Sequence, residues 1–477
     1  DEPTNHLDLN SVEWLEGYIK TFKGTVLAIS HDRYFIDRIA QRVIEIVDGH
    51  AEFYSGNYSF YMDEKQARFD LQMKQYEQEQ AKLKQLGYTV ERMKGWGINN
   101  RTLYRRAMSI QHRMERIKKT EKPKTEKTMK ATFGEKDFSG DVVFNMRNVS
   151  KAFGERTLFS GVDLKVEGGE RIAILGDNGT GKSTFIKCLL GEEDCAGKIQ
   201  FGPTVKWGYL PQIIHFSHPE RTLYDTMLYE KNCTPQVARD RLGAFLFQGE
   251  DVFKTVRTLS GGEQSRLRLC MLMDEKINLL ILDEPTNHLD SEMVAWLEER
   301  LRAFRGGIVM VTHDRYFLER VVNQITELSR GKLYHYEANY SKYLELKELR
   351  AEMAEASERK RQAILRTERE WIMRGCKART TKAKDRIQRY ENLLNQEAPE
   401  TDEILQLSAA SSRLGRKIIE LHGVSKSFDG RTIIENFSYN LLRADRIGIV
   451  GRNGAGKSTL LHMLAGTLQP DSGSVEF

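Results

Sequence analysis

Short apolar runs recur along parts of the chain and alternate with segments of helical character. Residues 171–175, 279–282 and 308–311 are apolar runs of strand length. Such runs, bounded by turn residues and separated by helical segments, are typical of buried strands in an α/β domain. The pattern therefore predicts α/β domains.

Elsewhere the chain changes to long, charged segments without strand-sized apolar runs. Their length and their glycine-containing interruptions predict two helical hairpins. The outgoing helices are expected at 61–93 and 343–371, the tips at 95–100 and 374–381, and the returning helices at 103–119 and 382–396.

The chain also repeats itself over the length of a whole domain. Residues 1–8 recur without change at 283–290, an offset of 282, and residues 176–183 recur with changes at 451–458, an offset of 275. Repeats of this length indicate duplicated domains rather than a solenoid. We expect, in order, the tail of one α/β domain (1–52), a helical linker (53–140), a complete α/β domain (141–336), a second helical linker (337–416) and the head of another α/β domain (417–477).

Composition narrows the class of protein. Charged residues make up 30% of the chain, above the usual quarter, which fits long solvated helices. The five cysteines show no C-x-x-C spacing, which argues against a disulfide framework or a zinc site. No apolar run approaches the roughly 18 residues of a membrane span, and no signal peptide is recognised. We expect a soluble, cytoplasmic protein that has no membrane partner.

The segment 176–183 reads Gly-Asp-Asn-Gly-Thr-Gly-Lys-Ser and lies between a predicted strand and a predicted helix. In this context the pattern predicts a phosphate-binding loop, because its glycines let backbone N–H groups approach phosphate oxygens at a helix N-terminus. Lys182 would hold the β- and γ-phosphates, and Ser183 would bind Mg²⁺. A chance glycine-rich turn is the alternative, which the flanking elements disfavour.

About a hundred residues later, the apolar strand predicted at 279–282 ends in Asp283 and Glu284. A buried strand presents such residues at its carboxyl edge, beside the phosphates. Asp283 suits the Mg²⁺ shell, and Glu284 suits the general base that activates the attacking water. Ordinary polar residues at a strand end are the alternative.

The segment 259–263 reads Leu-Ser-Gly-Gly-Glu, and with it the chain resembles the ATP-binding cassette superfamily, of which this is the signature sequence. The resemblance implies cassette domains with a RecA-like core, a β-subdomain and a helical signature subdomain. It also implies ATP binding and hydrolysis, with Mg²⁺. The amides of Ser260, Gly261 and Gly262 would reach the γ-phosphate bound by a partner cassette.

Several residues receive a role only from this resemblance. Gln212 matches the glutamine loop, 286–290 the D-loop, and His313 the switch histidine. Phe153 and Phe428, each 29 residues before the lysine of a phosphate loop, match the aromatic residue that stacks on adenine. Singly, His313 would more often be structural and Phe153 a core aromatic, but the ordered set favours the functional reading.

The complete set of expected site residues is as follows. Catalytic residues are Glu284, His313 and Gln212; ATP contacts are Phe153, Gly176, Asn178, Gly179, Gly181, Lys182, Ser183, Thr184, Ser260, Gly261, Gly262, Phe428, Gly451, Asn453, Gly454, Gly456, Lys457, Ser458 and Thr459; Mg²⁺ ligands are Ser183, Gln212, Asp283 and Ser458; and Asp1, Glu2 and His31 are the remnant of a second catalytic set.

Within the superfamily the chain resembles the ABC-F branch most. The D-loop reads Asn-His-Leu-Asp at 287–290, and charged helical connectors join the cassettes. The connectors resemble the linker with which ABC-F proteins reach rRNA and tRNA near the exit site of the ribosome. The resemblance implies a translation factor or a protein that protects ribosomes from antibiotics, docked by ATP and released by hydrolysis.

Charge along the connectors supports an RNA partner. Residues 359–389 hold 12 Lys or Arg against 3 Asp or Glu, and residues 91–130 hold 13 against 4. Phosphate backbones attract such clusters. The alternative is a solvated coiled coil whose aromatic residues pack its seam. The expected RNA contacts are Trp371, Arg374, Lys377, Arg379, Lys382, Arg101, Arg105 and Arg106.

Two other functions compete with this one. The first is the ATP-binding subunit of a transporter that acts with separate membrane partners. The second, a DNA-repair ATPase, would need a zinc hook or a similar insertion, and no such motif is present.

The order of segments also departs from the ABC-F pattern of cassette, linker and cassette. This departure indicates a fragment, a splice of two paralogues at 283–290, or a protein of three cassettes.

This order affects the expected chemistry. The site on Lys182 would lack a partner signature, and the site on Lys457 could borrow 259–263 but has no catalytic strand after it. The N-terminal tail could dock on the C-terminal head as in a permuted domain and supply Asp1, Glu2 and His31. Cassettes would pair within the chain or with another copy, and we expect ATP binding at Lys182 with slow turnover.

Overall fold

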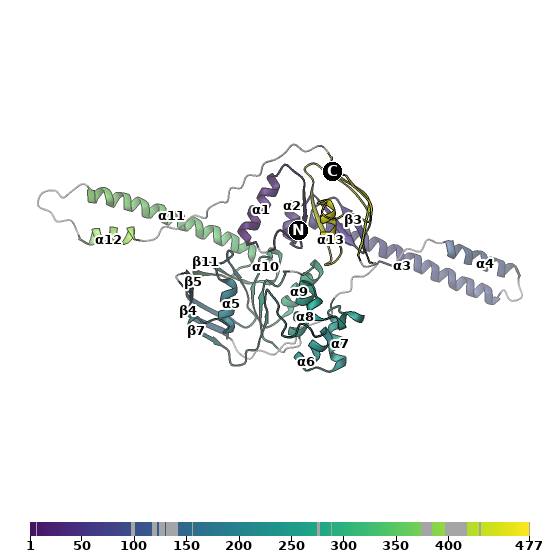
Figure 1. Cartoon of the computed structure of the whole chain (residues 1–477), viewed down its shortest axis with the longest axis horizontal. Helices are drawn as coiled ribbons and strands as arrows, with labels where there is room; N and C mark the ends of the chain where they lie inside the picture. Colours follow the sequence, from purple (N-terminus) through teal and green to yellow (C-terminus); the bar gives the residue numbers. More distant parts are fainter. Residues whose placement is uncertain are drawn as a thin grey trace.

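The computed structural model describes most of the chain. The described residues are 1–5, 7–96, 101–116, 122–123, 129, 142–154, 156–273, 277–287, 289–373, 384–395, 417–428 and 431–476. Their helices and strands form two α/β bodies that lie against one another, and two long helical hairpins that extend away from them (Figure 1).

The first body, here called the complete half, is built on a six-stranded sheet in the order β12-β11-β6-β10-β9-β8. All neighbours pair in parallel except β11 and β12, and the two strands β9 and β10 are buried along their whole length. Three strands of this sheet, β6, β9 and β10, correspond to the apolar runs predicted from the sequence. The six are β6 (Arg171–Leu175), β8 (Trp207–Leu210), β9 (Leu279–Asp283), β10 (Gly307–Val311), β11 (Gln324–Ser329) and β12 (Lys332–Tyr336).

A three-stranded antiparallel sheet and a set of helices enclose this core. One face of the six-stranded sheet shares a hydrophobic core with the small sheet and α5, and the other packs against the remaining helices. The elements are β4 (Val142–Phe153), β5 (Arg156–Glu167), β7 (Ala196–Phe201), α5 (Lys182–Leu190), α6 (Leu223–Lys231), α7 (Pro235–Ala244), the 3-10 turns η2 (Gly249–Phe253) and η3 (Val256–Thr258), α8 (Gly261–Met273), α9 (Ser291–Ala303) and α10 (Arg315–Val321).

The second body, here called the composite half, is assembled from segments at both ends of the chain. Strand β15 lies between β1 and β2, parallel to both, as β6 lies between β10 and β11 in the complete half. Ile29, Ile449 and Leu460 share one hydrophobic core. The elements are α1 (Leu9–Thr21), β1 (Val26–Ile29), α2 (Arg33–Ile39), β2 (Arg42–Val47), β3 (His50–Tyr54), β13 (Lys417–Phe428), β14 (Arg431–Leu442), β15 (Arg446–Gly451), α13 (Lys457–Leu464) and β16 (Ser472–Glu476).

The two hairpins leave the bodies in opposite directions (Figure 1). One comprises α3 (Tyr58–Trp96) and α4 (Arg101–Arg116), and the other α11 (Tyr340–Met373) and α12 (Lys384–Leu394). The outgoing helices begin three residues earlier than predicted. Asn57 and Asn339 accept hydrogen bonds from N–H groups three residues on, at 3.1 and 3.2 Å, and such caps fix a helix start. The predicted tip at 374–381 lies outside the described residues.

Candidate functional site

The loop between β6 and α5 has the shape of an anion cradle. Gly176, Gly179 and Gly181 adopt φ values of 154°, 77° and 103°, which only glycine adopts without strain. A Cβ on Gly176 would lie 2.5 Å from the carbonyl oxygen of Leu328. Lys182, the first residue of α5, is buried and donates to the carbonyl oxygens of Gly176 (2.7 Å) and Asp177 (3.0 Å). Its ammonium is thus held over the loop, and burial lowers its pKa.

Two carboxylates lie at the end of β9, which is separated from β6 in the sheet by β10. Ser183 Oγ donates to Asp283 Oδ1 at 3.4 Å, and Glu284 Oε1 lies 3.3 Å from His313 Nε2. Glu284 has a φ of 50°, an unusual conformation for a non-glycine residue, of the kind often found at functional sites. Burial, and then Asp283, raise the pKa of Glu284 to about 8, whereas burial, and then Lys182, lower that of His313 to about 4.

The composite half repeats this arrangement with residues from the two ends of the chain. Lys457 donates to the carbonyl oxygens of Gly451 (2.7 Å) and Arg452 (3.1 Å). Ser458 Oγ donates to Asp1 Oδ2 at 2.7 Å. Glu2 Oε1 lies 3.5 Å from His31 Nε2, and Glu2 has a φ of 44°.

The electrostatics of the second set also match the first. Burial raises the pKa of Glu2, and burial, and then Lys457, lower the pKa of His31 to about 4. Gly451, Gly454 and Gly456 have φ values of 152°, 78° and 101°. The carboxylates of the Lys457 site therefore do not come from a strand that follows it in the sequence. The docked N-terminal segment provides them, as the permuted arrangement suggested.

Both sites have the groups that a magnesium–nucleotide complex requires. Each combines a glycine loop at a helix start, a lysine, a serine hydroxyl and a carboxylate. Among the described residues, no cluster of three or more His, Cys, Asp or Glu could hold a metal by itself. Mg²⁺ would fit here nevertheless, because it commonly takes one or two protein ligands and completes its shell with phosphate oxygens and water.

The other predicted residues occupy varied positions. Phe153 and Phe428 end β4 and β13 with exposed rings (51% and 46%), available for stacking. Thr184 and Thr459 are half-buried in α5 and α13. Gln212, beyond β8, is exposed, and no hydrogen bond joins it to the site within the described residues.

The signature serine is held at the start of α8. Ser260 donates from its backbone N and its Oγ to Glu263 Oε2, at 2.9 and 2.8 Å, and Gly261 and Gly262 are the first residues of the helix. Of the expected RNA contacts, Arg105 and Arg106 are exposed on α4. Arg374, Lys377, Arg379 and Lys382, and the side chains of Arg101 and Trp371, lie outside what the structure describes.

Contacts between the two halves reach both phosphate loops. At the phosphate loop of the complete half, Asp8 Oδ2 accepts a hydrogen bond from the backbone N of Asn178 (3.0 Å), and Asn10 Nδ2 donates to Asp177 Oδ1 (2.8 Å). At the phosphate loop of the composite half, Arg452 Nε donates a hydrogen bond to Glu292 Oε1 at 2.7 Å. Asn178 was expected as an ATP contact, but no role was predicted for Asn10, Asp177, Glu292 or Arg452. The repeat offsets could have found them, because they relate position 10 to 292 and position 177 to 452.

Charged residues are buried where the halves meet. Arg315, 3% exposed, donates to Glu16 Oε1 at 2.8 Å, and Glu16 is 2% exposed. Asp32 and Asp314 cap α2 and α10 by accepting from N–H groups three residues on. Burial, and then Asp314, raise the pKa of Asp32 to about 7; burial also raises that of Asp314.

This carboxylate pair predicts a pH-dependent stability. A carboxyl group whose pKa is higher in the folded state than its ordinary 3.8 favours folding at low pH, and this contribution is lost as the pH rises through about 7. We expect Asp32→Asn, which keeps the helix cap, to raise the free energy of unfolding at pH 8 by about 2–4 kcal/mol, at about 1.4 kcal/mol per pKa unit. The gain should be small at pH 5. Urea denaturation at both pH values measures it, and an equal gain at both would contradict this account.

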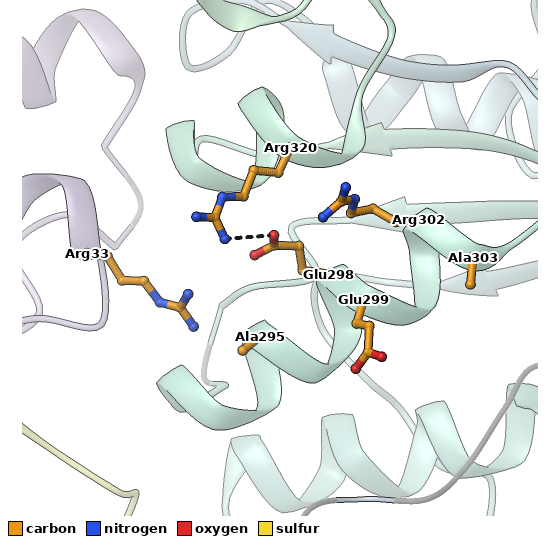
Figure 2. Close-up of a pocket in the computed structure, with 7 residues that line it drawn as sticks. All are labelled: Arg33, Ala295, Glu298, Glu299, Arg302, Ala303 and Arg320. Carbon is orange, nitrogen blue, oxygen red and sulfur yellow. Dashed lines mark hydrogen bonds and ion pairs between the residues drawn. The ribbon is translucent and has the colours of Figure 1, made fainter. Parts of the chain in front are cut away.

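A pocket of about 390 Å³ lies beside the interface, between Arg33 of the composite half and helices α9 and α10 of the complete half (Figure 2). Arg33 points toward Ala295 and Glu298, and Glu298 pairs with Arg320 at 3.1 Å. The lining residues include none of the phosphate-loop or carboxylate residues, so this pocket is separate from the sites described above.

Comparisons with known proteins agree with this geometry. Two family models, both described as ABC transporter, match the chain, one at residues 159–287 and 434–477 and the other at 44–133 and 326–407. The second covers much of both hairpins. In the part of the chain that is described, no helix is long and apolar enough to cross a membrane.

Three curated relatives are 36–38% identical to the chain over the aligned residues. The uncharacterized ABC transporter ATP-binding protein YfmR of Bacillus subtilis is 38% identical over 70% of this chain and 59% of its own length. The energy-dependent translational throttle protein EttA of Haemophilus influenzae is 36% identical, over 71% and 68%. ABC transporter F family member 5 of Arabidopsis thaliana is 36% identical, over 72% and 50%. The chain thus spans about half to two thirds of the length of these relatives.

Proposed function

Because the chain belongs to the ABC-F family of ATP-binding cassette proteins, we propose that it is an ATPase that binds Mg-ATP between its two halves and acts on the ribosome. The observation that carries the proposal is the duplicated arrangement of lysine, serine, aspartate, glutamate and histidine, one set in each half. One relative is named a translational throttle, which supports the choice of the ribosome as the target.

Each position in this arrangement has a defined task in the proposed reaction. Lys182 and Lys457 bind the β- and γ-phosphates. The hydroxyl–carboxylate pairs, Ser183 with Asp283 and Ser458 with Asp1, hold Mg²⁺, which supplies charge neutralisation when it is bound.

The glutamates would activate the attacking water. Glu284 and Glu2 each have a raised pKa, and a base whose pKa is near the working pH transfers protons most effectively. The carboxylate of each glutamate lies 3.3 or 3.5 Å from a histidine, His313 or His31, and each histidine is neutral near pH 7 because its pKa is about 4. A neutral ring can donate one hydrogen bond to the carboxylate or to a phosphate oxygen.

The hairpins provide the proposed RNA-binding surface. Both project far beyond the bodies that bind nucleotide, so their outer parts are accessible to a large partner (Figure 1). Arg105 and Arg106 lie side by side in sequence and are exposed on α4. Clustered exposed guanidinium groups favour phosphate backbones by electrostatic attraction and by release of counterions.

The deciding test is cosedimentation with ribosomes. The full chain carrying Glu2→Gln and Glu284→Gln, loaded with ATP, should pellet with ribosomes at low salt and remain in the supernatant without nucleotide. If the ATP-loaded variant stays off ribosomes at low salt, the ribosome assignment is wrong. Retention by membrane vesicles instead would favour a transporter subunit.

We expect Arg105→Glu/Arg106→Glu to weaken this ribosome binding at least tenfold, since two attractive phosphate contacts become repulsive. The slope of log binding constant against log salt should fall by about 1 or more, because each phosphate contact accounts for roughly 0.7–0.9. Glu79→Lys on the partner helix α3, which adds positive charge instead, is the matched control and should not weaken binding. An unchanged salt slope would remove these residues from the proposed surface.

A further inference from the structure

The contacts that reach the two phosphate loops use equivalent positions but different side chains. On one side Asn10 of the composite half bonds to Asp177 of the complete half at 2.8 Å. On the other side Glu292 of the complete half bonds to Arg452 of the composite half at 2.7 Å. The repeat offsets make Asn10 the counterpart of Glu292, and Asp177 the counterpart of Arg452.

Pairing two complete halves, or two composite halves, would replace both of these contacts. Two complete halves, paired through the same surface, would place Glu292 of one copy against Asp177 of the other. Two carboxylates would then face each other at both loops, and juxtaposed like charges oppose association. Two composite halves would place Asn10 against Arg452, so that the ion pair with Glu292 would be lost. Only the mixed pair has both the Asn10–Asp177 hydrogen bond and the Glu292–Arg452 ion pair.

The buried contacts at the centre of the interface also favour pairing of a complete half with a composite half. Arg315 of the complete half bonds to Glu16 of the composite half at 2.8 Å and lies 3.5 Å from Glu13. The counterpart of Glu13 in the complete half is Ala295. A second complete half would therefore offer Arg315 one carboxylate fewer, since only Glu298, the counterpart of Glu16, would remain.

Beside the pocket at the interface lies Arg33, the counterpart of Arg315 in the composite half, and the surroundings of the two arginines can be compared. There, Arg33 faces Ala295 and Glu298 across the pocket of about 390 Å³ (Figure 2), and no ion pair joins Arg33 to Glu298 within the described residues. Arg33 Nη2 donates instead to the backbone carbonyl oxygen of Ser291, so this surface of the complete half holds an interface arginine without an ion pair to Glu298. The surface of the composite half, with Glu13 and Glu16, encloses Arg315 fully, with 3% of its side chain exposed.

We propose that Asp177, Glu292 and Arg315 select the composite half as the partner of the complete half and exclude a complete half from another copy of the chain. The interface therefore directs pairing within one chain. This inference concerns pairing alone and does not depend on the proposed ribosome function, so either can fail without the other.

Cysteine cross-linking of the full chain tests which surfaces meet. Asn10→Cys/Asp177→Cys should form a disulfide within one chain on mild oxidation, identified by peptide mass spectrometry, with no increase in dimer on a non-reducing gel. Asn178→Cys/Asp290→Cys, placed at Asn178 and at the counterpart of its contact Asp8, would report a pair of complete halves while leaving Asp177 and Glu292 charged, and should give no more dimer than the parent chain with its native cysteines. Cross-linking between copies in the second variant, at the rate seen within the first, would overturn the proposal.

A charge change tests whether these side chains decide the pairing. Asp177→Arg would turn the repulsive contact with Glu292 between two complete halves into an attractive one, twice in each dimer. Light scattering should show the mass shift from 55.1 kDa toward twice that value as concentration rises. Asp177→Ala, which removes the charge without creating an attraction, should remain at the mass of one chain. An Asp177→Arg variant that is folded by circular dichroism and stays monomeric would overturn the selecting role of the charges.

Discussion

Replacing Glu2 with glutamine is expected to lower steady-state ATP turnover by the full chain at least a hundredfold, the usual lower range for loss of a general base. Glu284→Gln is expected to lower turnover by much less. The two glutamates have nearly the same geometry, with φ values of 44° and 50° and histidines at 3.5 and 3.3 Å. The expected difference therefore comes from what lies opposite each site.

The complete half faces the Lys457 site and holds the signature residues 260–262. In the cassette superfamily these amides stabilise the phosphate of the opposing site. The composite half faces the Lys182 site with Asp8 and Asn10, and its described residues include no counterpart of helices α6, α7 and α8. We therefore expect ATP to bind at both sites but to be hydrolysed mainly at the one built on Lys457.

Phosphate release measures the turnover, and equilibrium binding of labelled ATP to each variant shows that both retain nucleotide. Glutamine matches glutamate in size, so a large loss reports chemistry rather than packing. Turnover that survives Glu2→Gln and disappears with Glu284→Gln would reverse the assignment. It would also contradict the expectation, drawn from the sequence, that ATP bound at Lys182 is turned over slowly.

The second large effect is expected at the centre of the interface. Arg315→Ala should lower the free energy of unfolding by about 3–5 kcal/mol, because Glu16 would stay buried without its main partner. Burial already raises the pKa of Glu16, so the site is unfavourable for an isolated carboxylate. Arg38→Ala is the matched control: Arg38 contacts the same Glu16 at 3.4 Å but is 47% exposed, and we expect a loss of about 0.2–1 kcal/mol.

Chemical denaturation, with the resistance of the interface to limited proteolysis as a second readout, measures both variants. The double variant Arg315→Met/Glu16→Leu should recover most of the lost stability, because a pair of apolar residues of similar volume replaces a buried ion pair at little cost. Equal effects of Arg315→Ala and Arg38→Ala would show that the buried pair does not hold the halves together.

The sequence predicted the local parts of the sites because each is contiguous. The loop at 176–183 and the carboxylates after 279–282 lie where strand and helix patterns place them. The starts of the long helices were missed by three residues because the asparagine caps at Asn57 and Asn339 lie outside the apolar pattern. Helix caps act through one side chain and leave no periodic signal.

The relation between the halves required the structure. The pairing of β1 with β15 joins Val26 to Arg446, and no sequence period shows that such distant strands share a sheet. The contacts of Asp177 and Arg452 depend on how two finished surfaces dock, and each residue alone resembles any exposed charge near a loop. Asp1 and Glu2 could be identified as remnants of a catalytic site, but the association of Asp1 with Ser458 and of Glu2 with Lys457 depends on that sheet.

The pairing of β1 with β15 also determines the order in which the molecule can be completed during synthesis. The paired residues Val26 and Arg446 are 420 positions apart, so a ribosome adding about 5–20 residues per second needs roughly 20–80 s to supply the second strand after the first. During that interval the strand that shares a core with Ile29, Ile44 and Ile46 in this structure does not yet exist, whereas all six strands of the sheet in the complete half lie between residues 171 and 336. Apolar strands that wait for a distant partner are prone to aggregate, so folding of the composite half should depend on how quickly residues 417–477 follow.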